Sequence, residues 1–350
     1  MDVALVLQGG GALGAYEYGA VTELVRNGIK PKIVTGVSIG AINSSAIAGA
    51  KGGDIVGSLT ELWSRLTLDV PMFVPSEFLK SMALFGNPHF YQLRTDWWKY
   101  SQWTSFCDTS PIYETLRKVV DWERLNDTKT IRVAVTAVNV ATGVQTTFSN
   151  MKTRLDPRHI IASGSLPPGF PATLIDGQYY WDGGLFDNTP LPALFDLLTE
   201  DETENLPIIL IDLVPNAELF PRNLDQVRNR MTELSFENRF WDEYGGHKGL
   251  IDHARVLTEI NKLVPADHPL RRESEYRRMM EYCACKNLKV ITPIHQTMSE
   301  GHDFSAAGIA HRYQSGLAAA RAFLENELGS DRSSQPMRKN ASKAAALERA

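Results

Sequence analysis

Cysteine is scarce in this sequence, and basic residues are not in excess. The 350 residues include only Cys107, Cys283 and Cys285, with neither a CxxC pair nor histidines at the spacing of a zinc site. This composition suits a reducing cytoplasm, and we expect no bound metal and no cofactor. Acidic residues outnumber basic ones by 41 to 36, and the resulting net charge of −5 argues against a nucleic-acid partner.

Long apolar runs are also absent. No stretch approaches the roughly 18 apolar residues that cross a bilayer, and the run at residues 3–7 is too short for the core of a signal peptide. We therefore expect a cytoplasmic protein that is at most peripheral to a membrane. Residues 329–350 are polar and rich in alanine, so we predict a mobile tail there and one domain over residues 1–328.

The sequence does contain an alternation of strands and helices. A continuous apolar run at residues 3–7 predicts a buried strand, and apolar positions at three- and four-residue spacing predict a helix over 12–27. Residues 32–37 and 39–50 repeat this pair. The rhythm predicts an α/β fold with a mostly parallel sheet covered by helices. Further strands are predicted at 131–140, 178–181, 207–214 and 288–293, and helices across 225–283 and 305–328.

A glycine-rich segment, Gly9-Gly10-Gly11-Ala12-Leu13-Gly14, joins the first strand to the first helix. Glycines let backbone N–H groups approach a ligand, close to the positive end of the helix. The loop could cradle a pyrophosphate, stabilise an oxyanion or simply make a tight turn. Dinucleotide binding requires an acidic residue about 20 positions later. Positions 24–53 contain none, so the dinucleotide interpretation loses its main support.

A second motif, Gly36-Val37-Ser38-Ile39-Gly40, lies between the next predicted strand and helix. This is the context of a nucleophile elbow, in which a strained serine projects its hydroxyl at the helix N-terminus. The alternative is an ordinary helix-capping serine. The third motif, Asp182-Gly183-Gly184, closes the strand at 178–181 and would by itself indicate only a turn. The three motifs in this order form a much stronger signal than any one alone.

In these motifs the sequence resembles the patatin-like phospholipases, which are lipid acyl hydrolases. The family combines a glycine-rich oxyanion loop, a GxSxG nucleophile and an Asp-Gly-Gly base, seen here as GGGALG, GVSIG and DGG. Segments 162–171 and 188–190 are also similar, and the resemblance covers residues 2–215. Residues 216–328 look like an extension carried by one bacterial branch. One position departs from the pattern, because Leu13 stands where the family often has Lys or Arg.

The resemblance implies a three-layer sandwich and an enzyme that cleaves carboxylic esters of lipids, of the phospholipase A or lysophospholipase type. Ser38 would be the nucleophile and Asp182 the general base. An aspartate has an ordinary pKa near 3.9, so it could serve only if burial raised its pKa or the dyad were dry and aligned. The implied partner is a lipid or phospholipid, with transient contact at a membrane surface. The implied oxyanion donors are Gly9, Gly10 and Gly11, and the glycines that shape the motifs are Gly14, Gly36, Gly40, Gly183 and Gly184.

Two other functions remain open. A Ser-His-Asp esterase would take His295, His302 or His311 as its base, although its serine motif usually lies later in the sheet. A non-catalytic lipid- or nucleotide-binding module would not need the intact serine and aspartate. The aromatic-rich segment 63–106 could be an acyl-chain pocket, a lid or irregular core. A group of arginines could meet anionic headgroups or form a solvated helix face: Arg271, Arg272, Arg277 and Arg278.

Overall fold

The structure is a computed structural model that describes residues 1–68, 86–213, 220, 221, 227, 230, 231, 244–293 and 301–334, without the side chains of 328–334. Several predicted features lie outside these residues. They are His295 and the aromatic side chains of Phe73, Phe78 and Phe85. Residues 232–243 of the predicted helical stretch 225–283 and residues 335–350 of the predicted tail also lie outside.

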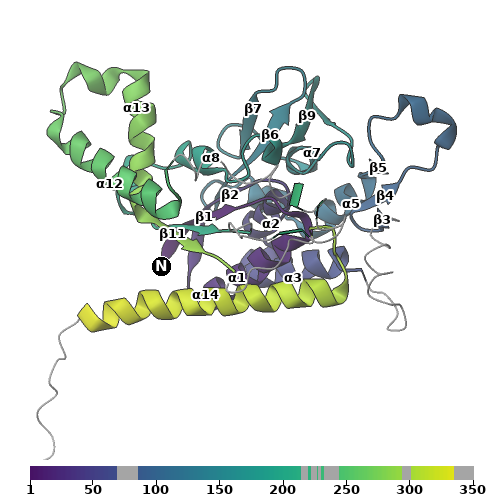
Figure 1. Ribbon diagram of the computed structural model, residues 1–350, viewed down its shortest axis with the longest axis horizontal. Helices are drawn as coiled ribbons and strands as arrows, with labels where there is room; N and C mark the ends of the chain where they lie inside the picture. The colour runs from purple at the N-terminus through teal and green to yellow at the C-terminus, as the bar shows by residue number, and fades with distance from the viewer. Residues whose placement is uncertain are drawn as a thin grey trace, which may run out of the picture.

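A mixed, mostly parallel sheet forms the centre of the molecule (Figure 1). Five strands are parallel, in the order β11-β10-β1-β2-β6. Their bounds are β1 Asp2–Leu7, β2 Lys30–Gly36, β6 Arg132–Asn139, β10 Ile208–Ile211 and β11 Leu288–Ile291. Each of these strands was predicted from its apolar run, so the α/β expectation is confirmed.

Antiparallel strands extend the sheet beyond β6. The predicted strand β9 (Gln178–Asp182) pairs with the second half of β6, β8 (Thr173–Ile175) pairs with β9, and β7 (Gln145–Ser149) pairs with β6. A small separate sheet contains β3 (Gly86–Asn87), β4 (Tyr91–Leu93) and β5 (Cys107–Asp108). The sequence analysis missed β7, β8 and this small sheet, because they are short and only partly buried.

Side chains alternate between two cores along β1. Val3, Leu5 and Leu7 point into a large core, whereas Ala4 and Val6 point into a second one. The large core contains side chains of α1 (Gly14–Arg26), α2 (Ile39–Ala48), α3 (Ile55–Leu66), α5 (Ser110–Val119) and α7 (Pro157–Ser163). The second core contains side chains of α8 (Leu191–Phe195) and α12 (His247–Leu263). Helices therefore cover both faces of the sheet, as in a three-layer sandwich.

The remaining helices in the described part of the chain are short, apart from the last. They are α6 (Trp122–Leu125), α9 (Glu200–Asn205) and α13 (Ser274–Glu281). Both α12 and α13 lie in the range 225–283 that was predicted to be helical. The last helix, α14 (Ala306–Ser334), runs beyond the predicted end at 328 and lies along α1 (Figure 1). The two backbones approach closely at Gly19 and Gly316, where any Cβ would collide with the other helix. Among the described residues, no helix is long and apolar enough to cross a membrane.

Candidate active site

The strand register brings the three motifs to one edge of the sheet. Strands β1 and β2 are parallel with Leu7 opposite Gly36, so the residues that follow each strand emerge side by side. Strand β9 runs antiparallel to β6 with Asp182 opposite Ala137, just beyond the point where Val135 pairs with Gly36. The glycine loop, Ser38 and Asp182 therefore meet at the carboxyl ends of the parallel strands.

Ser38 occupies a strained turn between β2 and α2. Its φ of 55° and ψ of −122° lie outside the regions that non-glycine residues favour. The backbone N–H of Ser38 donates to the Ser163 carbonyl at 3.0 Å. Although Ser38 is the N-cap residue of α2, its side chain accepts no capping hydrogen bond. The half-buried hydroxyl is thus not used to cap the helix.

Gly36 and Gly40 make this turn possible by close approach of backbones. A Cβ on Gly36 would collide with the Gly40 carbonyl, and a Cβ on Gly40 would collide with the carbonyls of Leu7 and Gln8. Gly14 is equally restricted, because a Cβ there would strike the Ile39 side chain at the start of α2. These glycines allow the elbow and the glycine loop to pack directly against each other.

Asp182 is buried at the end of β9, with 1% of its surface exposed. Burial raises the pKa of Asp182 from 3.8 to about 7, while hydrogen bonds from the Gly184 N–H and the Ser38 side chain oppose the rise. The Gly184 N–H lies 2.8 Å from Asp182 Oδ1. Gly183 lets the chain turn here, because a Cβ would collide with the Thr136 carbonyl. Asp182 is therefore directed at Ser38 and holds a proton far more readily than an exposed aspartate.

The glycine loop passes Ser38 at Gly9 and leaves two backbone donors without an acceptor in the described part of the chain. The Gly9 N–H donates to Asn188 Oδ1 at 3.0 Å, but the N–H groups of Gly10 and Gly11 have no acceptor among the described residues. Gly11 has a φ of 58° and packs against the carbonyl of Gly301. A Cβ placed on Gly9 would lie 3.0 Å from the Ser38 Cβ. The loop thus runs immediately beside the serine.

A family model described as patatin-like phospholipase matches residues 5–195 of the chain, a span that holds all three motifs. The chain belongs to the patatin-like phospholipase family. This membership supports lipid hydrolase activity.

Two solved structures are similar to this patatin-like chain. VipD from Legionella pneumophila is 16% identical with a TM-score of 0.41, and the match covers 93% of this chain and 67% of VipD. ExoU from Pseudomonas aeruginosa, solved in complex with SpcU, is 14% identical with a TM-score of 0.27, and the match covers 94% of this chain and 79% of that chain. No curated protein sequence matches the chain.

Two buried side chains that the sequence analysis did not single out organise the patatin-like site. The Asn188 side chain bonds the N–H and the carbonyl of Gly9, and Ser163 Oγ accepts from the Ser38 N–H at 3.1 Å, beside the bond to the Ser163 carbonyl. Both fall in segments that resemble the family, but their types alone gave no role. Gln8 adds a further tie, because its side chain donates to Thr189 Oγ1 at 2.6 Å and accepts from the Leu213 N–H at 2.8 Å. The bonds of Asn188 and Thr189 therefore connect the segment that follows Asp182 to the end of β1.

Another buried group, the carboxyl of Glu17, lies near the glycine loop. The Glu17 carboxyl accepts from Asn43 Nδ2 at 2.8 Å, and Asn43 also donates to the Gly14 carbonyl at 3.0 Å and accepts from Trp63 Nε1. Burial raises the pKa of Glu17 well above its usual value, whereas bonds from Asn43 and the Gln8 backbone lower it. Trp63 is therefore a core residue, not part of a surface lid.

The histidines of the alternative mechanism lie in two different settings. His311 is exposed on α14. His302 is partly buried and follows Gly301, whose carbonyl accepts from the Ala12 N–H at 2.7 Å. His302 is therefore adjacent in sequence to a residue that packs on the glycine loop, so variants of the candidate histidines are needed to separate the two mechanisms.

The structure also places residues of the aromatic-rich segment, one of the arginines and Leu13. Trp97, Trp98 and Tyr100 on the segment after β4 are 64%, 81% and 60% exposed. Arg271 is structural, because its guanidinium donates to Asn261 and to carbonyls at the end of α12. Leu13, at the position where relatives carry a cation, packs against the large core.

Proposed function

We propose that this protein is a serine acyl hydrolase that cleaves carboxylic esters of phospholipids through a covalent acyl-enzyme. The observation that carries the proposal is the pairing of a strained Ser38 with a buried Asp182 whose pKa is raised to about 7. A general base works best when its pKa lies near the operating pH. Asp182 meets this condition without a histidine.

In the first step, Ser38 Oγ attacks the ester carbonyl carbon while Asp182 takes the hydroxyl proton. The carbonyl oxygen gains negative charge, which the N–H groups of Gly10 and Gly11 stabilise. Gly9 was also expected to donate, but its N–H is engaged by Asn188, so our proposal assigns the oxyanion hole to Gly10 and Gly11. One such donor typically contributes about 3–4 kcal/mol to lowering the barrier.

To complete acylation, protonated Asp182 gives its proton to the departing alcohol oxygen, and the acyl group stays on Ser38. A water molecule then attacks the acyl carbonyl as Asp182 accepts its proton. The tetrahedral intermediate collapses, the proton returns to Ser38 Oγ, and the fatty acid leaves. Asp182 thus acts as base and then acid in acylation, and again as base and then acid in deacylation.

We further propose that the aromatic side chains after β4 contact the lipid surface. Trp97, Trp98 and Tyr100 are largely exposed on one short segment, and such rings favour the boundary between water and lipid. The contact would be peripheral and transient. Replacing both tryptophans with alanine should weaken binding to phosphatidylcholine vesicles and leave the turnover of a soluble ester unchanged.

The test of the proposed activity has two parts. A fluorophosphonate probe should add once to the wild type, on the peptide that holds Ser38, and should not add to Ser38→Ala. Wild type incubated with phosphatidylcholine vesicles should release fatty acid and lysophospholipid, whereas Ser38→Ala should release neither. Labelling of another serine, or equal release by the variant, would contradict the proposal.

A further inference from the structure

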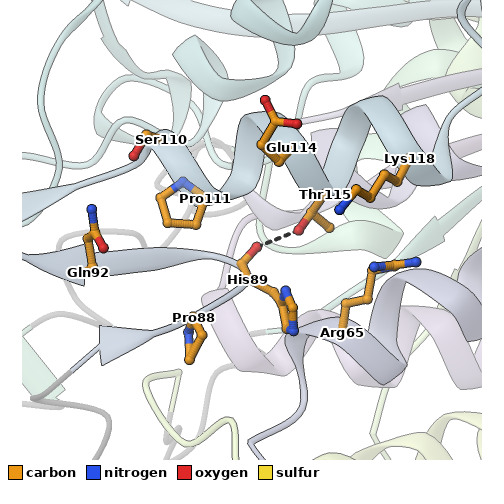
Figure 2. A pocket seen from close by; sticks show the side chains of 9 residues that line it. All are labelled: Arg65, Pro88, His89, Gln92, Ser110, Pro111, Glu114, Thr115 and Lys118. Atoms are coloured by element: carbon orange, nitrogen blue, oxygen red, sulfur yellow. Dashed lines mark hydrogen bonds between the residues drawn. The ribbon is translucent and has the colours of Figure 1, made fainter.

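A second polar site lies away from the catalytic motifs, between α3, the segment at 88–92 and α5 (Figure 2). It is an open pocket of about 430 Å³. Arg65 borders it from α3, His89 and Gln92 from the segment around β4, and Ser110 and Lys118 from α5. None of these residues belongs to the three motifs.

Most neutral polar groups of the pocket already donate to protein acceptors. Gln92 Nε2 donates to Asp108 Oδ2 at 2.8 Å, and Ser110 Oγ donates to the same oxygen at 2.6 Å. Thr115 Oγ1 donates to the His89 carbonyl at 2.7 Å, the bond drawn in Figure 2. A ligand would therefore have to be recognised mainly by the remaining side chains.

Those remaining side chains are donors that carry or can carry positive charge. The Nε atom of Arg65 is buried and has no partner within the described part of the chain, although another nitrogen of the guanidinium lies 3.0 Å from Glu61. Lys118 Nζ and the His89 imidazole make no hydrogen bond or ion pair to any described residue. Figure 2 shows that these three side chains come from three different segments around the pocket, Arg65 from α3, Lys118 from α5 and His89 from the segment before β4.

The neighbouring carboxylates are shared with other donors, so they only partly neutralise this positive charge. Glu114 lines the pocket, but its carboxylate is turned away in Figure 2 and pairs with Arg117 at 2.9 Å. Glu61 pairs with Lys51 as well as Arg65, and Asp108 accepts from Ser110 and Gln92. The pocket therefore retains unpaired donors and no unpaired carboxylate among the residues described here.

We propose that this pocket binds a phosphate-bearing anion, held by Arg65, Lys118 and His89. A phosphate presents several acceptor oxygens that can receive bonds from a guanidinium, an ammonium and an imidazole together. The volume leaves room for the group to which the phosphate is attached. That group is a phospholipid headgroup or a soluble phosphorylated metabolite, and the chemistry at the cations is the same for both.

The binding experiment compares three single variants of the full chain. Inorganic phosphate and glycerol 3-phosphate are titrated calorimetrically at constant ionic strength into wild type, Arg65→Gln, Lys118→Gln and Lys129→Gln. Lys129→Gln is the matched control, because it removes the same charge as Lys118→Gln from an exposed position after α6 that does not line the pocket. Arg65→Gln and Lys118→Gln should each weaken binding about tenfold or more, whereas Lys129→Gln should change it less than twofold.

A second arm identifies the source of the phosphate. Phosphatidylcholine vesicles with and without a phosphoinositide are sedimented with Ser38→Ala protein, so that the result does not depend on hydrolysis. An increase in retention with the phosphoinositide that is lost in Lys118→Gln assigns a lipid headgroup. Binding of glycerol 3-phosphate without such retention assigns a soluble metabolite. The proposal is overturned if no probe binds, or if Lys129→Gln weakens binding as much as the pocket variants.

Discussion

The side-chain amide of Asn188 bonds both backbone polar groups of Gly9. Asn188 Nδ2 donates to the Gly9 carbonyl at 3.1 Å, and Asn188 Oδ1 accepts from the Gly9 N–H at 3.0 Å. Both residues are buried, and 179 positions separate them in sequence. This bidentate contact sets the position of the peptide that precedes the two free donors of the glycine loop.

Asn188→Ala should therefore reduce turnover more than it reduces stability. Without the amide, Gly10 and Gly11 lose their fixed position beside Ser38, and a misplaced catalytic group can cost on the order of 10²-fold. The matched control is Asn150→Ala, another buried asparagine that bonds backbone groups, at Leu125, Ile131 and Val133. Both variants should lower Tm, but only Asn188→Ala should lower kcat on a p-nitrophenyl ester. Equal kcat values for the two variants would contradict this role.

The raised pKa of Asp182 predicts a rate that increases with pH. Asp182 accepts a proton only when it is deprotonated, so kcat/KM should rise as pH increases through about 7 and then level off. An aspartate with an ordinary pKa of 3.8 would already have reached that plateau in mildly acidic buffer. The measurement is a pH–rate profile with a soluble ester. A profile that is flat across neutral pH would show that this group does not control the rate.

Glu17 should make the free energy of unfolding depend on pH. Because its folded-state pKa is raised, protonation stabilises the fold fully below the unfolded value near 4.5, and this contribution is lost as pH rises toward the folded value. Glu17→Gln keeps the shape without the ionisable group. Urea unfolding at several pH values should show the variant gaining on wild type as pH rises above about 4.5. A pH-independent difference between the two proteins would contradict the raised pKa.

The sequence predicted β1 and β10 well because each is a largely apolar run buried on both faces, as at Ile208–Ile211. It also predicted the elbow, because a glycine two positions on either side of Ser38 reports a close backbone approach. It did not predict β7, whose residues are mostly half-buried and carry no strong pattern. The bond between Asn188 and Gly9 was equally hidden, because it depends on tertiary placement and not on local spacing.

The same limit applies to the choice of base. Asp182 could be named from the family resemblance, but its raised pKa follows from burial that only the fold reveals. Likewise, nothing in the local sequence of His302 shows that its neighbour Gly301 packs on the glycine loop.

We propose that Asp182 takes the serine proton without the help of a histidine. The most direct measurement is kcat on a soluble ester for Asp182→Asn, His295→Ala, His302→Ala and His311→Ala, with the Tm of each variant recorded. Asp182→Asn should fold and lose on the order of 10³-fold or more in kcat, while each histidine variant stays within about tenfold of wild type. If a histidine variant keeps its Tm and loses a thousandfold or more, histidine is the base and the Ser38–Asp182 dyad is wrong.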